Sequence, residues 1–93
     1  MLNLIVKYHA KDSISRVQFV SELMSSGAAA SVRAEDGCIR YDYYYSAEDE
    51  CEVLLFEQWE SKEKQEVHMT QPHMATIKGI KEKYIESTEL ETL

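Results

Sequence analysis

Hydrophobic positions along this 93-residue chain change their spacing several times, and each change marks a different element. At residues 2–9 they alternate with polar ones, so that Leu2, Leu4, Val6 and Tyr8 share one face. This period of two, in a segment rich in branched and aromatic side chains, predicts a strand.

The next segment has apolar residues three and four positions apart, which is typical of a helix. Asp12 or Ser13 can serve as its N-cap. Gly27 weakens the middle of this helical region, and the alanine-rich residues 28–34 can continue it. The predicted apolar stripe consists of Ile14, Val17, Val20, Leu23 and Met24.

Two strands and a hairpin are predicted after the pair Asp36-Gly37, which ends the helix. A turn near residues 46–50 pairs positions whose numbers sum to about 97, so that Cys38 lies opposite Trp59 while Cys51 lies beside the turn. The two sulfur atoms are then beyond disulfide reach, and we expect two free thiols, with Cys38 in the core. The strand at residues 37–46 carries Ile39, Tyr41, Tyr43 and Tyr45 on one face, and Cys38, Arg40, Asp42 and Tyr44 on the other.

The remaining residues predict a broken helical region and a last strand. Ser61 starts a helix, and Pro72 cannot continue it but suits the first turn of the next helix. Residues 84–93 supply the final strand. The order is therefore β-α-β-β-α-β, which predicts a single α+β domain over residues 1–93. The expected fold is ferredoxin-like, a four-stranded antiparallel sheet with helices on one face.

The strand at residues 51–60 is apolar on both faces, although helices can cover only one. Val53 and Leu55 alternate with Leu54 and Phe56, and the tyrosine-rich strand is two-sided as well. The uncovered face has to be buried by something else, and a second copy of the same sheet is the simplest cover. We therefore predict a homodimer.

Composition limits the partners. The net charge is −7, and the lysines are interleaved with glutamates, so neither nucleic acid nor a membrane surface is an expected partner. The apolar run at the start is too short for a secretory signal or a membrane span. With no CxxC pair among the cysteines, we predict a protein of the reducing cytoplasm.

The segment HMTQPHM at residues 68–74 is the most unusual stretch. A metal site usually takes two histidines four apart on one helix face, but His68 and His73 are five apart, about 140° of helical rotation. We therefore predict no metal site. The alternative is a corner between two helices, with His68 near one helix end and His73 in the first turn of the next.

The segments EDGCIRYDYYYS and VLLFEQWESKEKQEVHMTQPHM resemble the antibiotic biosynthesis monooxygenase family. The shared elements are an acidic residue and Gly37-Cys38 before a tyrosine strand, the E-x-W-x-S-K pattern at 57–62, and the His68…Pro72-His73 corner. The resemblance implies a dimeric α+β barrel with a pocket between sheet and helices in each protomer. It also implies cofactor-free oxygenation, haem degradation or isomerisation of a phosphorylated sugar, since the family includes all three.

Cofactor-free oxygenation requires a base and a dry pocket that shelters an electron-rich anion. We expect His68 to be the base, because its unperturbed pKa is about 6.5, and Trp59 to stack on the substrate and donate its N–H. The other candidate substrate-binding residues are Asn3, Tyr41, Tyr43, Glu57 and His73. Each also has a structural interpretation: Trp59 and the tyrosines as core, Glu57 as a partner of His68 or of a helix N-terminus, and His73 as a cap.

Some positions depart from the active family members that the chain resembles. Polyphenol monooxygenases of the family carry Asn and Tyr where this chain has Leu55 and Gln65, and the axial histidine of haem-degrading members falls near Ile77. The sequence therefore predicts a monooxygenase without cofactor or metal, acting on a small aromatic or quinol-like substrate. Two alternatives stay open: a dimeric module that binds a small ligand without turnover, and an isomerase of a small phosphorylated metabolite.

Overall fold

A computed structural model describes all 93 residues, which form four strands and four helices. The order is β-α-α-β-β-α-α-β, because both predicted helical regions are divided in two. The elements are β1 (Leu2–Ala10), α1 (Ser13–Ser25), α2 (Ala28–Arg33), β2 (Cys38–Tyr45), β3 (Glu52–Trp59), α3 (Lys62–His68), α4 (His73–Tyr84) and β4 (Ile85–Thr92).

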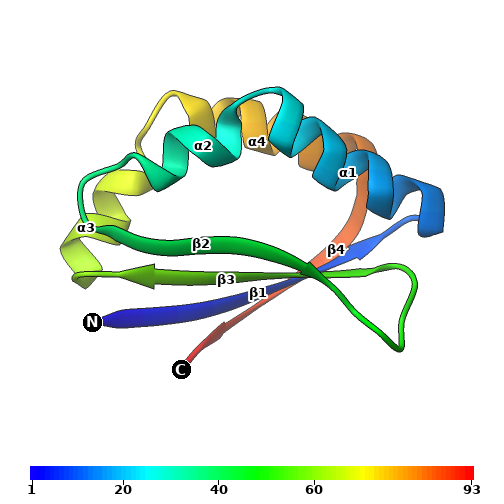
Figure 1. Cartoon of the computed structure of the whole chain (residues 1–93), viewed down its shortest axis with the longest axis horizontal. Helices are drawn as coiled ribbons and strands as arrows, with labels where there is room; N and C mark the ends of the chain where they lie inside the picture. Colours follow the sequence, from blue (N-terminus) through cyan, green and yellow to red (C-terminus); the bar gives the residue numbers. More distant parts are fainter.

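The four strands form one antiparallel sheet in the order β2-β3-β1-β4, and the helices cover one of its faces (Figure 1). This confirms the predicted ferredoxin-like α+β fold. The N-caps Asp12 and Ser61 are also confirmed, since each side chain accepts a hydrogen bond from the backbone N–H three residues later.

Gly27 divides the first helical region, which the sequence predicted as continuous. Its backbone has a φ of 79°, a left-handed conformation that glycine adopts without a steric penalty. The backbone N–H of Ser26 bonds to the carbonyl oxygen of Glu22, so α1 ends normally before the chain turns into α2.

The β2–β3 hairpin has the predicted register, with Cys38 opposite Trp59. Both cysteines are free, as expected, and Cys38 packs against the core. The predicted position of Ile39 was wrong. The register shifts between Cys38 and Arg40, and this bulge leaves Ile39 49% exposed instead of on the inner face with Tyr41.

The inner face of α1 also differs from the predicted stripe. Ile14, Val17 and Met24 are exposed, whereas Phe19 and Leu23 are fully buried. The ring of Phe19 lies 5.1 Å from that of Tyr8. A large aromatic side chain therefore sets the orientation of the helix. Leu23 and Val20 of the predicted stripe do pack in or against the core, and the other three residues are turned toward solvent.

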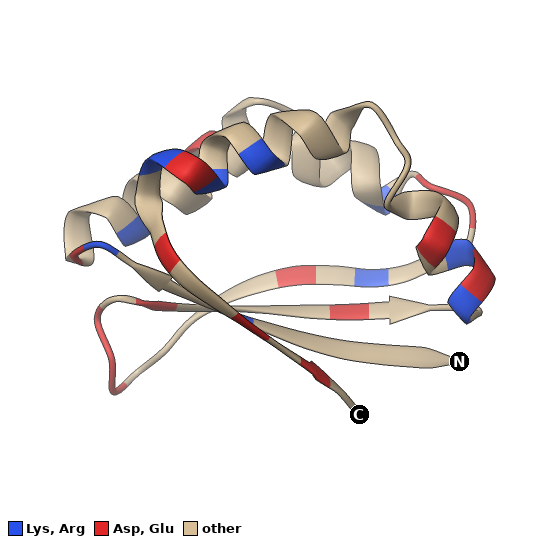
Figure 2. Ribbon diagram, turned by 180° about the vertical axis from the view of Figure 1, so that it is seen from behind, with Lys and Arg blue, Asp and Glu red and all other residues tan.

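Lysines and arginines are scattered among acidic residues over the molecule, and no basic stripe forms on the face that Figure 2 shows. None of the helices is both long and apolar enough to cross a membrane. The absence of nucleic-acid and membrane partners stays a prediction.

The core assignment can be tested with two substitutions in α1. We expect Phe19→Ala to lower the free energy of unfolding by about 3–5 kcal/mol, because it empties a fully buried site. Ile14→Ala should change it by no more than about 0.5 kcal/mol. Urea denaturation measures both, and a larger loss for Ile14→Ala would restore the stripe predicted from the sequence.

Candidate functional site

The corner between α3 and α4 turns the two predicted histidines toward each other. His68 is the last residue of α3, His73 is the first of α4, and Pro72 stands at the N-cap with a helical φ of −57°. The backbone N–H of Gln71 bonds to the carbonyl oxygen of His68, which closes a tight turn between the helices. The predicted helix corner is confirmed.

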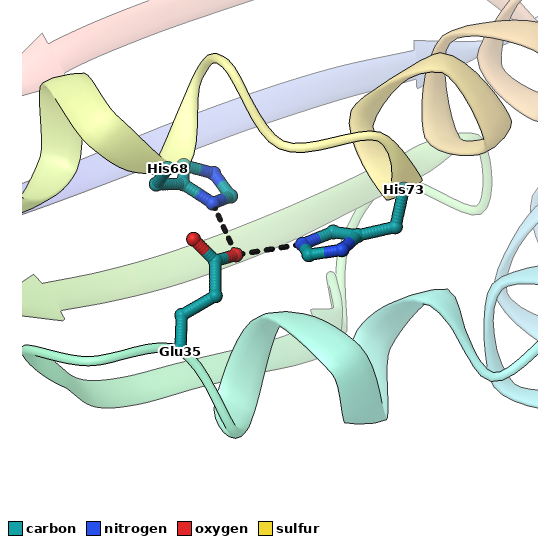
Figure 3. Close-up of side chains that lie close together, drawn as sticks. All are labelled: Glu35, His68 and His73. Atoms are coloured by element: carbon teal, nitrogen blue, oxygen red, sulfur yellow. Dashed lines mark hydrogen bonds and ion pairs between the residues drawn. The ribbon is translucent and has the colours of Figure 1, made fainter.

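Glu35 lies between the two imidazoles (Figure 3). Its Oε2 is 2.7 Å from Nδ1 of His68 and 2.7 Å from Nε2 of His73. One carboxylate oxygen has two lone pairs and can accept both hydrogen bonds. Two histidines five residues apart therefore meet at one acceptor, because the chain turns at Pro72 between them. The absence of a metal site stays a prediction.

The sequence analysis did not select Glu35. Its only signal was its position two residues before Gly37, in the acidic segment that carried the family resemblance. It follows α2, and the backbone N–H of Cys38 bonds to its carbonyl oxygen. This turn directs the carboxylate toward the helix corner, 33 and 38 residues further along the chain.

His68 is held among aromatic rings and is only 2% exposed. Its ring centroid lies 4.6 Å from that of Trp59, at an interplanar angle of 34°, and 5.9 Å from that of Tyr41. Because the Glu35 carboxylate accepts from Nδ1, that nitrogen carries the hydrogen and Nε2 carries the lone pair of the neutral ring. Nε2 of His68 has no hydrogen-bond partner within the chain.

Trp59 donates its indole N–H to Oε1 of Glu57 at 3.0 Å, and both residues are buried. Trp59 was expected to donate this N–H to a substrate oxygen, but in this structure the group is already engaged. Burial raises the pKa of Glu57 above its usual value, although the Trp59 hydrogen bond and nearby His68 oppose the shift. Glu57 was also expected to partner His68 or a helix N-terminus, and its hydrogen bond goes instead to Trp59.

Tyr41 and Tyr43 form a second aromatic group beside His68. The hydroxyl of Tyr43 donates to that of Tyr41 at 3.2 Å, and the rings meet edge to face with centroids 5.6 Å apart. Burial raises the pKa of both phenols well above the usual value for tyrosine. They therefore stay protonated at neutral pH and act as neutral hydrogen-bonding groups.

Asn3 is separated from the other candidate residues. It pairs with Gln58 on the sheet face opposite the helices, where the side chain of Gln58 donates to its Oδ1 at 3.1 Å. Leu4 and Trp59 flank this pair and point to the inner face, where both are buried. Asn3 therefore cannot contact a ligand held at His68 within the same chain.

An apolar hollow of about 150 Å³ lies at the C-terminal end of β2. It is lined by Val20, Tyr43, Tyr44 and Tyr45. Tyr43 belongs both to this hollow and to the pair with Tyr41, which contacts His68. A row of aromatic rings thus joins the hollow to the buried histidine.

Comparison with known proteins gives a family and a fold. The antibiotic biosynthesis monooxygenase family matches residues 16–79. No curated protein matches the chain.

Solved structures from three bacteria are similar over almost the whole chain. Proteins from Pseudomonas aeruginosa and Mycobacterium tuberculosis are each 25% identical, with a TM-score of 0.83 over 99% of this chain and 90% and 91% of theirs. A candidate antibiotic biosynthesis monooxygenase from Caulobacter crescentus is 16% identical, with a TM-score of 0.88 over 99% of this chain and 86% of its own. This last similarity shows the fold alone.

The raised pKa of Glu57 leads to a pH-dependent stability. The folded chain holds this proton more tightly than the unfolded chain, so the stabilising effect is present below the unfolded pKa and is lost as the pH rises through the folded pKa. Glu57→Gln removes the titration. We expect the variant to gain stability relative to the wild type as the pH rises above about 4.3, the usual pKa of glutamate.

Urea denaturation at several pH values measures this difference in the free energy of unfolding. Glu60→Gln, at an exposed position just beyond Trp59, is the matched control and should show no such trend. A pH-independent difference for Glu57→Gln would mean that the Glu57 carboxyl group has the same pKa in the folded and unfolded chain.

Proposed function

Because the chain belongs to the antibiotic biosynthesis monooxygenase family, we propose that it is a cofactor-independent monooxygenase acting on a small aromatic or quinol-like phenol. His68 is the general base. Glu35 positions it, and the rings of Trp59 and Tyr41 form the walls beside the reacting ring.

The observation that carries this proposal is the hydrogen bond between Glu35 and His68. A carboxylate that accepts from Nδ1 fixes both the tautomer and the orientation of the imidazole, and it stabilises the imidazolium that forms when Nε2 takes a proton. Nε2 has no hydrogen-bond partner within the chain, so its lone pair is free to take a proton. A histidine that only filled the core would not need a tautomer that leaves Nε2 free.

The reaction needs no external reductant, because the substrate supplies the electrons. His68 takes the phenol proton, and the phenolate passes an electron to dioxygen. Oxygen then bonds to a hydrogen-bearing ring carbon ortho or para to the hydroxyl, and the resulting hydroperoxide loses water to leave a quinone. One oxygen atom enters the product and the other leaves as water, whose two hydrogens come from the substrate O–H and the C–H of the attacked carbon.

The aromatic surroundings suit such an anion. Trp59 and Tyr41 exclude bulk water from the ring of His68, and a low dielectric strengthens the interaction between imidazolium and phenolate. The protonated phenols of Tyr41 and Tyr43 can donate to the substrate oxygen after rearrangement of their mutual bond. The hollow next to Tyr43 is an apolar surface within two aromatic rings of His68.

A second copy of the chain is the inferred partner. The sheet face opposite the helices carries Ile5, Leu54 and Phe56, each only partly buried, and no helix covers them (Figure 1). Two such faces packed together would bury this apolar surface. The free cysteines suit the reducing cytoplasm, where we place the dimer.

Oxygen uptake tests the proposed activity. Metal-stripped protein should consume dioxygen with at least one member of a panel of quinols and dihydroxyaromatics. His68→Ala should lower the rate by about 10²–10⁴-fold, the usual contribution of a general base. Glu35→Gln keeps the size of the side chain but removes the charge, and we expect a smaller loss with a shifted pH–rate profile.

His9→Ala is the matched control, since His9 also pairs with a glutamate but lies on the open sheet face. It should retain the full rate. Ligand binding without oxygen uptake would instead support the binding module, and uptake that survives His68→Ala in a folded variant would remove His68 from the mechanism.

The oligomeric state is a separate measurement. We expect Phe56→Glu to convert a dimer to a monomer in analytical ultracentrifugation at micromolar concentration, because it places a charge in the middle of the inferred interface. Val17→Glu alters an exposed apolar residue on the helical side and should leave the dimer intact. A wild-type chain that sediments as a folded monomer would contradict the inferred dimer.

A further inference from the structure

We propose that Glu35, His68 and His73 form a binding site for one zinc ion. This site goes beyond the proposed oxygenase activity, which requires no metal. It would be a second use of the same three side chains, in which the ion replaces the two hydrogen bonds now made to Glu35 (Figure 3).

The three ligand atoms are already close together. Nδ1 of His68, Nε2 of His73 and a carboxylate oxygen of Glu35 all lie within 4.8 Å of one another. Zinc bonds to nitrogen and oxygen are about 2.0–2.2 Å long, so neighbouring ligand atoms of a tetrahedral site are about 3.3 Å apart. The nitrogen–oxygen separations of 2.7 Å therefore need to widen by only about half an ångström.

The ligand types are those of an open zinc site. Two imidazoles and one carboxylate, with a fourth position left for water, are a known zinc ligand set. The carboxylate contributes the negative charge, and buried Glu57, which interacts electrostatically with His68, adds a second acidic group nearby. Lys64 of α3 is paired with Asp36 and not with Glu35.

The site is also accessible from one side. The side chain of His73 is 21% exposed, that of Glu35 is 10% exposed, and that of His68 is 2% exposed. An ion can therefore approach past His73, while His68 forms the buried wall. The stacked ring of Trp59 holds His68 in place, as neighbouring groups commonly do for metal-binding histidines.

Metal binding would require a change of tautomer. A zinc ion takes the lone pair of Nδ1 of His68, so the ring hydrogen moves to Nε2, and in the same way the hydrogen of His73 moves to Nδ1. Nε2 can then no longer accept a proton. One consequence rests on the proposed function. Zinc should inhibit the oxygenase, because it removes the tautomer of His68 whose Nε2 can accept a proton.

Isothermal titration of metal-stripped protein with zinc chloride at pH 7.5 (roughly one unit above the usual histidine pKa) tests the site directly. We expect one zinc ion per chain. His73→Ala and Glu35→Gln should each weaken binding by at least about 10-fold, since each removes a ligand or its charge. Cobalt(II) added in place of zinc should give the visible absorption of a tetrahedral site, and His73→Ala should abolish it.

Two controls separate this site from adventitious binding. His9→Ala removes a histidine that is paired with Glu89 but has no second imidazole, and it should leave zinc affinity unchanged. Cys51→Ser removes the thiol at the hairpin turn and should also have no effect. Zinc binding that survives His73→Ala and Glu35→Gln in folded variants, or that is lost in either control, would overturn the proposal.

The result does not depend on finding a substrate. One zinc ion bound through His73 and Glu35, together with no oxygen uptake, would support the metal site and count against the oxygenase. Oxygen uptake that is unaffected by zinc, with no zinc-binding heat, would overturn the metal site and leave the oxygenase intact.

Discussion

A single carboxylate oxygen that accepts two hydrogen bonds organises one end of this molecule. Glu35 follows α2, His68 ends α3 and His73 begins α4, so the bonds at 2.7 Å tie the α3–α4 corner to a residue more than 30 positions earlier in the chain. The corner at Pro72 makes this possible by turning the chain between the two histidines. Without the carboxylate, the two imidazole donors would face each other with no acceptor between them, and a buried donor without a partner is costly.

Much of the fold follows from local patterns. The alternation in β1, the hairpin register that sets Cys38 opposite Trp59, and the break at Pro72 all depend on residues close together in the chain. The orientation of α1 was mispredicted because it depends on a distant contact, that of Phe19 with Tyr8. The position of Ile39 was mispredicted because a bulge leaves no mark in the alternation of side chains.

Only part of the candidate site was predictable, because some of its contacts join residues that are distant in sequence. His68 and Trp59 were identified from their residue types and the family pattern, and their rings lie in contact, with centroids 4.6 Å apart. Glu35 was not identified, because its role depends on a contact across 33 residues that no local pattern encodes. Asn3 was selected for its residue type alone, and the alternation that buries Leu4 turns it to the sheet face opposite the helices. The family match establishes the fold, while the chemistry has to be argued from these few side chains.

The two outer strands of the sheet, β2 and β4, have consequences for aggregation. Such strands expose unpaired backbone groups to which another chain can add. Here β2 is interrupted by its bulge, and β4 carries Glu86, Glu89 and Glu91, whose charges repel a like strand. Edge-to-edge addition of further chains, and so growth into filaments, is thus disfavoured at both sides of the sheet.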